Sequence, residues 1–396
     1  MTEQEKNALC RNEIVAMMCQ AWKPETAEEC IPLTESCGRI LSRDAFAINT
    51  LPLVRASAMD GIAVKADAFA GGVMPDTFGW ILGEDYVRAD TGDDFSDAYD
   101  AVIPIEEVEM KEQGIALSCD PTQIVPGKCV RPSGSMVKEG ELVVPRGYKI
   151  TPYRVASLAT AGVKEVWVSR KPVVTFIPTG SELIPAGETP RRGQNVESNG
   201  LMIRELVTGW GAEFHSQPIV KDQMTQLEDA LLTAVEASDI VLINGGSSKG
   251  SEDYSIPLIE KYGEVLQHYV RSAPGRPMSV SIVKHTLVIN IPGPTLAAFA
   301  VCDWAAKSAI EHFLGAAETL GKEVEAILDK EVKCPPFMEI YTRVIVEEKD
   351  GAYHASPLGR DSRMDDGAGR CNGILVTELG RHGYQAGDHA KVKLII

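Results

Sequence analysis

The spacing of hydrophobic and polar residues changes three times along this chain of 396 residues. Residues 11–22 carry apolar side chains at helical spacing, which predicts an N-terminal helix. From about residue 31 to 150, short β-branched runs alternate with Gly and Pro, a pattern typical of β-rich structure. The first part of the chain is therefore expected to be a helix followed by a β-rich region.

Between residues 171 and 321 the pattern alternates between strands and helices. Short, almost wholly apolar runs predict buried strands at 171–180, 238–246 and 285–293. Amphipathic runs predict helices at 200–211, 222–237 and 294–315, and a further short helix beginning near Asp253. This alternation predicts an open, mostly parallel α/β sheet with helices on both faces. After Gly321 short strands return, which predicts a small C-terminal β domain.

The charge of the chain restricts how it could bind a phosphate. The sequence has 39 Lys and Arg against 56 Asp and Glu, a formal net charge of −17. Binding such an acidic chain would release no net counterions from a nucleic acid, which argues against a general nucleic-acid binder. A phosphate ligand would have to be held locally, by backbone N–H groups, helix N-termini, a few cations or Mg²⁺.

Cysteine content and hydropathy point to the cytoplasm. The nine cysteines include no Cys-x-x-Cys pair, so neither a zinc site nor a disulfide framework is predicted, and free thiols are expected. The chain shows no signal-peptide core and no run of 18 or more apolar residues, so no membrane segment is expected.

Loops rich in Gly, Ser, Thr and Pro follow three of the predicted strands, at 178–182, 245–250 and 292–295. In a parallel sheet all three lie at the carboxyl edge, where open α/β folds bind ligands. The glycines of the second loop allow a close approach, and its N–H groups and hydroxyls can hold an anion. A flexible turn explains any one of these loops alone, but three at one edge favour a ligand site.

Three carboxylates stand beside these loops, and acidic groups next to a phosphate cradle suit Mg²⁺. Helix capping explains Asp222 and Asp253 equally well, whereas Glu182 lies within a turn and not on an obvious solvated face, so a purely structural role is harder to give it. Outside the sheet, Asp60-Gly61 is a tight-turn signal between strands, and no neighbouring residue assigns a function to Asp60.

Taken together, the motifs resemble those of the molybdopterin molybdotransferases, which are related to the C-terminal domain of gephyrin. They are spread from about residue 32 to 315 in the order usual for the family. The motifs are Leu51-Pro52 followed by SAMDGIAV, Asp90-Thr91-Gly92, PTGSEL leading to GQNVESN, GGSSKGSEDY and SAPGRP.

The resemblance implies four domains and a homodimer. Residues 1–44 and 145–170 would form an extended dimerisation domain, 45–144 an inserted β-rich domain, 171–321 the α/β molybdopterin-binding domain and 322–396 a barrel-like domain. The active cleft would lie between the α/β domain of one subunit and the inserted domain of the other. Other proteins of molybdenum cofactor biosynthesis are expected as partners.

The activity implied is insertion of molybdate, or of tungstate, into adenylylated molybdopterin with release of AMP, the final step of molybdenum cofactor biosynthesis. Mg²⁺ is the implied cofactor. The catalytic positions carried over by motif are Asp60, Thr91, Glu182, Asp222 and Asp253; Asp253 and Glu182 are also the implied Mg²⁺ ligands. The ligand-binding positions carried over are Thr179, Gly180, Ser181, Gly245, Gly246, Ser247, Ser248, Gly250, Pro274, Gly275, Arg276 and Gly293.

Four positions depart from the usual family motifs. The usual Lys-Pro-Gly-Lys-Pro is Ala273–Pro277 here, so one Lys is lost and the other is Arg276. Residues 292–295 stand where the family usually has Pro-Gly-Asn-Pro, and they lack the Asn. Residues 134–136 stand where it usually has Gly-Glu-Asp, and they lack both carboxylates. Ser181 replaces the Asp of the usual Thr-Gly-Asp-Glu. Cations that could replace the lost Lys are Arg131, Lys138, Arg191, Arg192, Lys249 and Arg271.

These departures leave two alternatives open beside the enzyme. One is a family member that binds a pterin or nucleotide without inserting metal, as a carrier, regulator or scaffold. The other is a hydrolase that acts on a different phosphoanhydride in the same cleft.

Overall fold

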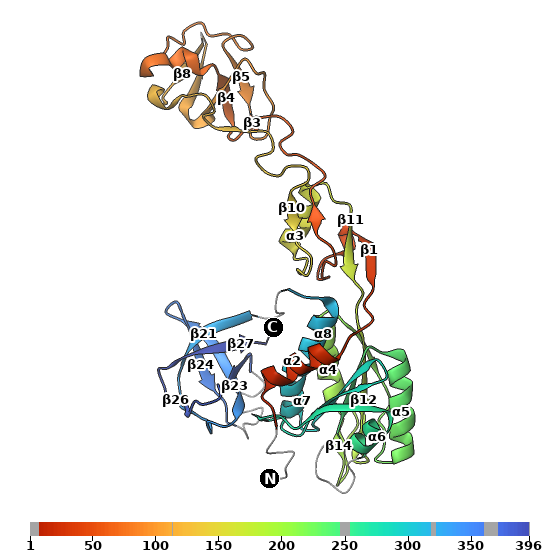
Figure 1. Ribbon diagram of the computed structural model, residues 1–396. Coiled ribbons are helices and arrows are strands. Elements are labelled where there is room, and N and C mark those ends of the chain that lie inside the picture. Colours follow the sequence, from red (N-terminus) through yellow and green to blue (C-terminus); the bar gives the residue numbers. More distant parts are fainter. Residues whose placement is uncertain (1–7, 113, 246–253, 318–321, 360–370, 396) are drawn as a thin grey trace. The chain divides into compact units, whose positions relative to one another are not determined.

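A computed structural model describes residues 8–112, 114–245, 254–317, 322–359 and 371–395, drawn in colour in Figure 1. The chain divides into two compact units. Unit 1 comprises Met1–Glu29 and Ser169–Ile396, and unit 2 comprises Cys30–Val168. No helix in the described ranges is long and apolar enough to cross a membrane.

A six-stranded sheet forms the centre of unit 1. Its strand order is β15-β12-β16-β20-β19-β17. The strands are β15 (Glu213–Ser216), β12 (Val173–Pro178), β16 (Ile240–Asn244), β20 (Thr286–Ile291), β19 (Ser279–Val283) and β17 (Gly263–His268). The first four run parallel, and β19 runs antiparallel to both of its neighbours, β20 and β17. The prediction of an open, mostly parallel sheet is confirmed, and β17 and β19 are additions that the sequence pattern did not reveal.

Helices cover both faces of this sheet (Figure 1). One face packs against α5 (Met224–Ala237) and α6 (Ser255–Tyr262), whose apolar side chains join those of the strands in one cluster. On the other face lies α4 (Asn199–Gly209), where Gly200 approaches Phe176 of β12. The remaining helices of unit 1 are α2 (Arg11–Ala21), α7 (Thr295–Val301) and α8 (Lys307–Leu314).

Three predicted helices differ from the structure in their bounds or form. The helix expected over 222–237 begins at Met224, and the one expected near Asp253 begins at Ser255. The long helix expected over 294–315 is continuous in space, but a π turn (Cys302–Ala306) separates α7 from α8. The N-terminal helix is confirmed as α2.

The C-terminal part of unit 1 is a closed five-stranded β-barrel, as expected. Its strands pair in the ring β23-β24-β21-β27-β25, which closes because β25 also pairs with β23. They are β21 (Lys322–Leu328), β23 (Glu339–Lys349), β24 (Ala352–Pro357), β25 (Gly373–Val376) and β27 (His389–Leu394). The shorter strands β22 (Val332–Lys333) and β26 (Gly383–Tyr384) pair with each other, and β18 (Ser272–Ala273) lies alongside β23.

Polar contacts join α2 and the barrel to the rest of unit 1. The Arg11 guanidinium donates to both carboxylate oxygens of Glu339 at 2.9 and 3.0 Å and to the Tyr341 hydroxyl at 2.8 Å. Lys393 of the barrel donates to Asp303 in the π turn at 2.5 Å. The three parts of unit 1 therefore share a network of hydrogen bonds between charged groups.

Unit 2 is β-rich, as predicted for 31–150. One apolar core surrounds β4 (Gly61–Val64), which pairs with β5 (Tyr86–Ala89) and β6 (Ala101–Pro104). Beside it lie the hairpin β7 (Val108–Lys111) and β8 (Gly114–Leu117) and the pair β3 (Ala56–Ser57) and β9 (Val130–Arg131). A second core surrounds α3 (Pro152–Thr160), with β1 (Glu28–Pro32), β2 (Ala45–Phe46), β10 (Leu142–Val144) and β11 (Glu165–Ser169).

Candidate functional site

The loop after β12 is tied to the ends of two neighbouring strands. The backbone N–H and the hydroxyl of Thr179 both donate to the Asn244 carbonyl at 3.0 Å. The Ser181 N–H donates to Asp222 Oδ2 at 2.7 Å, and the Asp222 N–H donates back to the Ser181 hydroxyl at 3.1 Å. Two of the predicted site residues, Ser181 and Asp222, are therefore in direct contact.

Asp222 does not cap a helix, so the interpretation of this residue as a helix cap is wrong. Helix α5 begins at Met224, and its N-cap residue is Gln223, whose side chain makes no capping hydrogen bond. The Asp222 carboxylate instead faces the loop after β12, because it accepts from Ser181. From this position the carboxylate can also face a ligand or a cation at this edge of the sheet.

Glycine is required where the loops after β12 and β16 meet. Gly245 has φ +114°, and a Cβ there would lie 2.6 Å from Thr179 Oγ1. Any side chain at this position would therefore push the two loops apart. The rest of the second loop, with the predicted site residues Gly246, Ser247, Ser248, Gly250 and Asp253 and the cation Lys249, lies outside the described residues.

Two buried asparagines connect the loop after β20 to this junction, and sequence reasoning missed both. Asn199 Nδ2 donates to Asn244 Oδ1 at 2.9 Å and to the Gly293 carbonyl at 2.7 Å. Asn244 Nδ2 donates to the Pro292 carbonyl at 2.8 Å. The signal in the sequence is an Asn at the end of an otherwise apolar strand run, which needs buried partners.

Four backbone donors of the described loop residues are engaged within the fold. The N–H groups of Thr179, Gly180, Ser181 and Gly245 donate to Asn244, Val220, Asp222 and Ile291, respectively. They are therefore not available to an anion. The Ser181 hydroxyl accepts from Asp222, which leaves its own proton free to donate to a ligand.

The loop that carries Pro274, Gly275 and Arg276 is held close to α7. Gly275 has φ +107°, and a Cβ there would lie 2.9 Å from a methyl carbon of Val301. The Arg276 carbonyl accepts from Val270 N–H at 3.1 Å, which closes the loop. Of the cations considered as replacements for the lost Lys, Arg271 is paired with Glu13 at 3.3 Å.

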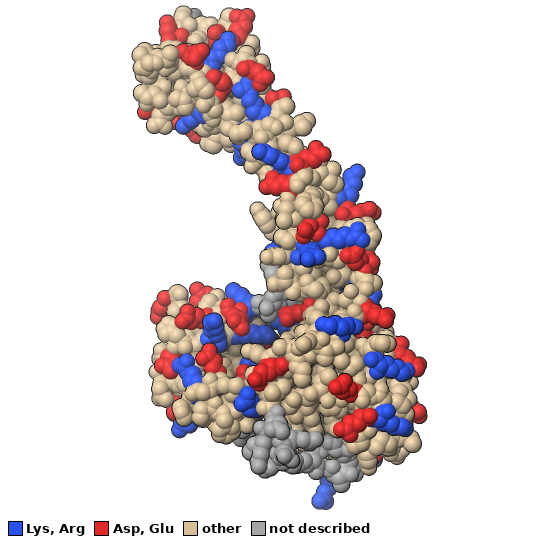
Figure 2. Space-filling model, viewed as in Figure 1, with Lys and Arg blue, Asp and Glu red and all other residues tan. Residues whose placement is uncertain are grey.

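A pocket of about 470 Å³ opens beside the loop after β12. Its lining is mostly apolar, but it includes Gly180 and Ser181 and two charged residues, Glu197 and Lys221. Lys221 was not among the predicted residues, although it follows the β15 segment closely in the sequence. Over the face shown in Figure 2, basic and acidic side chains are interspersed, so any anion site depends on a few local cations of this kind.

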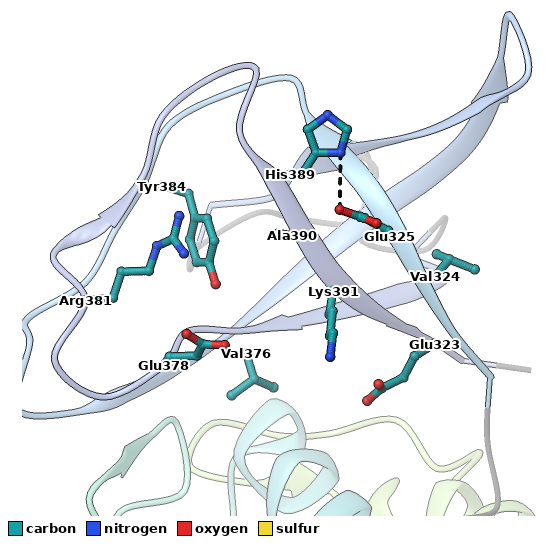
Figure 3. A pocket seen from close by; sticks show the side chains of 10 residues that line it. All are labelled: Glu323, Val324, Glu325, Val376, Glu378, Arg381, Tyr384, His389, Ala390 and Lys391. Atoms are coloured by element: carbon teal, nitrogen blue, oxygen red, sulfur yellow. Dashed lines mark ion pairs between the residues drawn. The ribbon is translucent and has the colours of Figure 1, made fainter.

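A second pocket, of about 370 Å³, lies on the barrel (Figure 3). Glu323, Glu325 and Glu378 share it with Arg381 and Lys391. His389 pairs with Glu325 at 3.4 Å, and the Arg381 guanidinium lies 3.8 Å from the centre of the Tyr384 ring. Because acidic and basic groups are mixed in its lining, this pocket selects neither anions nor cations, and none of its residues was predicted as part of the site.

In unit 2 the structure brings Asp60 and Thr91 together. The Thr91 N–H donates to Asp60 Oδ1 at 2.6 Å, and the Asp60 carbonyl accepts from Ile105 N–H at 2.8 Å. The hydrogen bonds from Thr91 lower the pKa of Asp60, and the nearby Arg88 lowers it further. Gly61 is required here, because a Cβ would lie 2.0 Å from the Ile103 carbonyl oxygen on β6.

The carboxylates at the edge of the α/β sheet fit the way proteins bind Mg²⁺. Within the described ranges, no group of three or more His, Cys, Asp or Glu residues could hold a metal. Mg²⁺ commonly uses only one or two carboxylates together with substrate phosphates and water. The Asp222 carboxylate contacts Ser181, and the Glu182 carboxylate lies next to Gly180, where a Cβ would be 2.7 Å from Glu182 Oε2.

Two family models match the chain. One, described as "MoeA N-terminal region (domain I and II)", matches residues 6–162, and the other, described as "Probable molybdopterin binding domain", matches residues 175–312. Together they cover about three quarters of the chain.

Curated relatives match this chain over two thirds or more of its length. The molybdopterin molybdenumtransferase of Bacillus subtilis is 27% identical over 402 residues, which is 97% of this chain and 93% of that protein. The gephyrin of Dictyostelium discoideum is 28% identical over 319 residues, 67% of this chain and 44% of gephyrin. A crystal structure of the molybdopterin biosynthesis moeA protein from Pyrococcus horikoshii OT3 matches 98% of this chain and all of that one, with a TM-score of 0.77 and 23% identity, which supports the fold.

Proposed function

Because the chain belongs to the molybdopterin molybdotransferase family, the family of MoeA and gephyrin, we propose that it inserts molybdate into adenylylated molybdopterin and releases AMP. The observation that carries this proposal is the junction at the carboxyl edge of the sheet. There Asn199 and Asn244 connect Thr179 to Gly293, and Ser181, which lies in the same loop as Thr179, contacts Asp222.

Each group at this edge has a part in the proposed reaction. The Ser181 hydroxyl donates to a phosphate oxygen of the ligand, and Lys221 supplies a positive charge from the wall of the pocket. The Arg276 guanidinium presents a planar fork of donors that suits an oxyanion such as molybdate. A water molecule adds to one phosphorus as the phosphoanhydride bond breaks, so AMP leaves and the other phosphate stays on the pterin. The two dithiolene sulfurs bind the molybdenum, and one molybdate oxygen leaves as water with the two thiol protons.

Mg²⁺ belongs to this proposal as the cofactor. Glu182 and Asp222 would hold it, together with Asp253, which lies outside the described residues. Its chemistry would be to neutralise charge on the phosphates as the anhydride breaks. The protein's own contribution is to orient the phosphates between Ser181 and Lys221, because positioning accounts for much of catalysis in such reactions.

The proposal extends to the assembly. We expect a cytoplasmic homodimer in which Asp60 and Thr91 of one subunit reach the α/β edge of the other. Their hydrogen bond fixes the 90–92 segment, which would let Thr91 orient a water or an oxyanion there. Arg131 and Lys138 belong to unit 2 as well.

One feature favours the alternative of a binding protein that does not insert metal. The loop at 273–277 has Ala273 at the position of a usual family Lys, and the nearby Arg271 is engaged with Glu13. Arg276 is then the main cation of this loop. If it is not sufficient for molybdate, the chain would bind the pterin nucleotide and keep it intact.

AMP release separates the three functions. Purified protein is mixed with adenylylated molybdopterin and Mg²⁺, with and without molybdate, and AMP is measured by chromatography. Release that depends on molybdate supports insertion. Tight ligand binding without AMP release supports the carrier, and release at the same rate without molybdate supports a hydrolase. Ser181→Ala is the matched variant, expected to slow release about 10-fold because one donor to the phosphate is lost.

A further inference from the structure

Four polar side chains are completely buried on one side of the α/β sheet and lack hydrogen-bond partners. They are Ser255, Ser279, Ser281 and Asn290, each with 0 % of its surface exposed. Among the described residues, no partner exists for either amide atom of Asn290 or for the three hydroxyl oxygens. We call these four residues the buried polar patch.

The strand register places the patch under α6. Ser279 lies directly opposite Asn290, and Ser281 lies opposite Val288. Val288 belongs to the apolar cluster that includes Leu258 of α6. Because opposite residues of an antiparallel pair point to the same face of a sheet, the side chains of Ser279, Ser281 and Asn290 all point toward α6.

The patch also lies at the ligand end of the sheet. Asn290 is two residues before Pro292, where the loop after β20 begins, and Ser279 is its direct neighbour across the strands. Ser255 is the first residue of α6 and lies three residues before Leu258, so both are on the helix face that packs against the sheet. The patch is therefore next to the loops of the candidate site, on the opposite face of the sheet from Asn244.

The comparison with Asn244 shows that the missing partners are unusual for this edge. Asn244 ends β16, beside β20, and its amide both donates to Pro292 and accepts from Asn199. Asn290 is as deeply buried but makes neither kind of bond. Leaving a buried polar group unpaired destabilises a fold. A fold that carries four such residues in one place gains stability from any ligand that supplies the missing partners.

The chemistry of the patch selects the kind of ligand. Three hydroxyls and one carboxamide offer both donors and acceptors and carry no charge. They suit the edge of a neutral heterocycle with adjacent N–H and C=O groups, for which a carboxamide is a natural two-point partner. A phosphate or molybdate would need a cation, and the patch contains none.

We propose that the buried polar patch is the subsite that recognises the pyrimidinone edge of the substrate's pterin ring, a proposal that rests on the proposed function. Asn290 pairs with the edge through one donor and one acceptor, and Ser279 and Ser281 bind the flanking polar atoms. The patch is closed in the free chain, so the ring reaches it when the Ser255 end of α6 moves away from the sheet.

The test combines stability and binding in one variant. Asn290→Leu replaces the amide by an apolar side chain of similar size, so the melting temperature of the free protein should rise. The affinity for a 6-substituted pterin, measured by its fluorescence, should fall at least about 10-fold because two hydrogen bonds are lost. Binding of AMP, measured by calorimetry, should change less than 2-fold. Asn244→Leu is the matched control, and its melting temperature should fall because its amide is fully paired.

If Asn290→Leu folds poorly, Ser279→Ala is the second variant, because it removes only one oxygen atom. Ser279→Ala should weaken pterin binding about 3-fold and leave AMP binding unchanged. Unchanged pterin affinity in both variants would overturn the proposal. The proposal would also be overturned if Asn290→Leu lowered the melting temperature and weakened pterin and AMP binding equally, since the patch would then have a purely structural role. Failure to bind pterin at all would also overturn it. A protein that binds pterin through Asn290 yet releases no AMP would leave the subsite standing and reject the proposed enzyme.

Discussion

The two places where predicted site residues meet are built in different ways. At the edge of the α/β sheet, three loops are joined by Asn199 and Asn244, which are both buried and uncharged. In unit 2, two loops are joined by the exposed carboxylate of Asp60, which accepts from Thr91. Breaking the buried hydrogen bonds between neutral side chains should lower the free energy of unfolding, because it leaves buried polar groups unpaired. The exposed hydrogen bond to a carboxylate should instead weaken when the carboxylate is protonated at low pH. The predictions below test this difference.

The largest effect is expected where a backbone contact leaves no room for a side chain. Gly61→Ala would put a Cβ 2.0 Å from the Ile103 carbonyl oxygen, so the central strand of unit 2 must shift. We expect the free energy of unfolding to fall by roughly 3 kcal/mol, measured by urea denaturation. Gly209→Ala in α4 is the control, since a Cβ there meets nothing within 4 Å; it should be neutral or stabilise the protein slightly. Equal behaviour of the two variants would reject the steric argument.

The buried hydrogen bonds are tested by Asn199→Ala. The substitution leaves Asn244 Oδ1 and the Gly293 carbonyl without their donor. We expect a loss of about 2 kcal/mol in the free energy of unfolding, together with weaker binding of the pterin nucleotide. In the double variant with Asn244→Ala the losses should not add, because both substitutions break the same bond. Additive losses would show that the two asparagines act separately.

Lys307 combines the two properties compared above, because it is buried and its charge depends on pH. Lys307 is almost fully buried, and its pKa is lowered to about 8, first by burial and then by the nearby Lys393, against the attraction of Glu311 and Asp303. Between pH 8 and the unfolded value near 10.5, the unfolded chain binds the extra proton. Stability should therefore rise with pH across that window.

Lys307→Met should remove this rise and increase the free energy of unfolding at pH 7 by roughly 1 kcal/mol, because a buried cation is replaced by an apolar side chain. Thermal melts at pH 7, 8 and 9.5 measure both effects. Lys261→Met on the surface serves as the control and should leave the slope between pH 8 and 9.5 as it is. A Lys307→Met protein with the wild-type slope would contradict the lowered pKa.

The smallest effect on stability is expected at the exposed hydrogen bond to Asp60. The folded pKa of Asp60 is lowered, chiefly by its hydrogen bonds from Thr91, so its contribution is present above the unfolded value of 3.8. It is lost as pH falls through the lower, folded value. Asp60→Asn should abolish that part of the acid dependence while changing stability at pH 7 little. Hydrogen exchange of the Thr91 amide, corrected for the intrinsic rate at each pH, is the readout, and protection that is already lost above pH 3.8 in the wild type would contradict the account.

Much of the fold followed from periodicity, because buried strands and amphipathic helices repeat at fixed spacings. The parallel core and the C-terminal β domain were predictable for that reason, whereas the barrel form of that domain was expected only from the resemblance. Strands β17 and β19 were not predictable, since GEVLQH and SVSIV are short and half polar. Asp60 and Thr91 were predictable only through the resemblance, because they are 31 residues apart and meet through a backbone N–H. Asn199, Asn244 and Asn290 were missed, since no local pattern tells whether a buried amide has partners.

The most direct test of the proposed activity is the ratio of AMP released to molybdenum bound. The protein is incubated with adenylylated molybdopterin, Mg²⁺ and molybdate, and both products are quantified on the same sample, AMP by chromatography and pterin-bound molybdenum by elemental mass spectrometry. Insertion at the α/β edge predicts one molybdenum bound for each AMP released, and a parallel loss of both in Ser181→Ala. AMP released without bound molybdenum, or bound ligand without AMP, would contradict it.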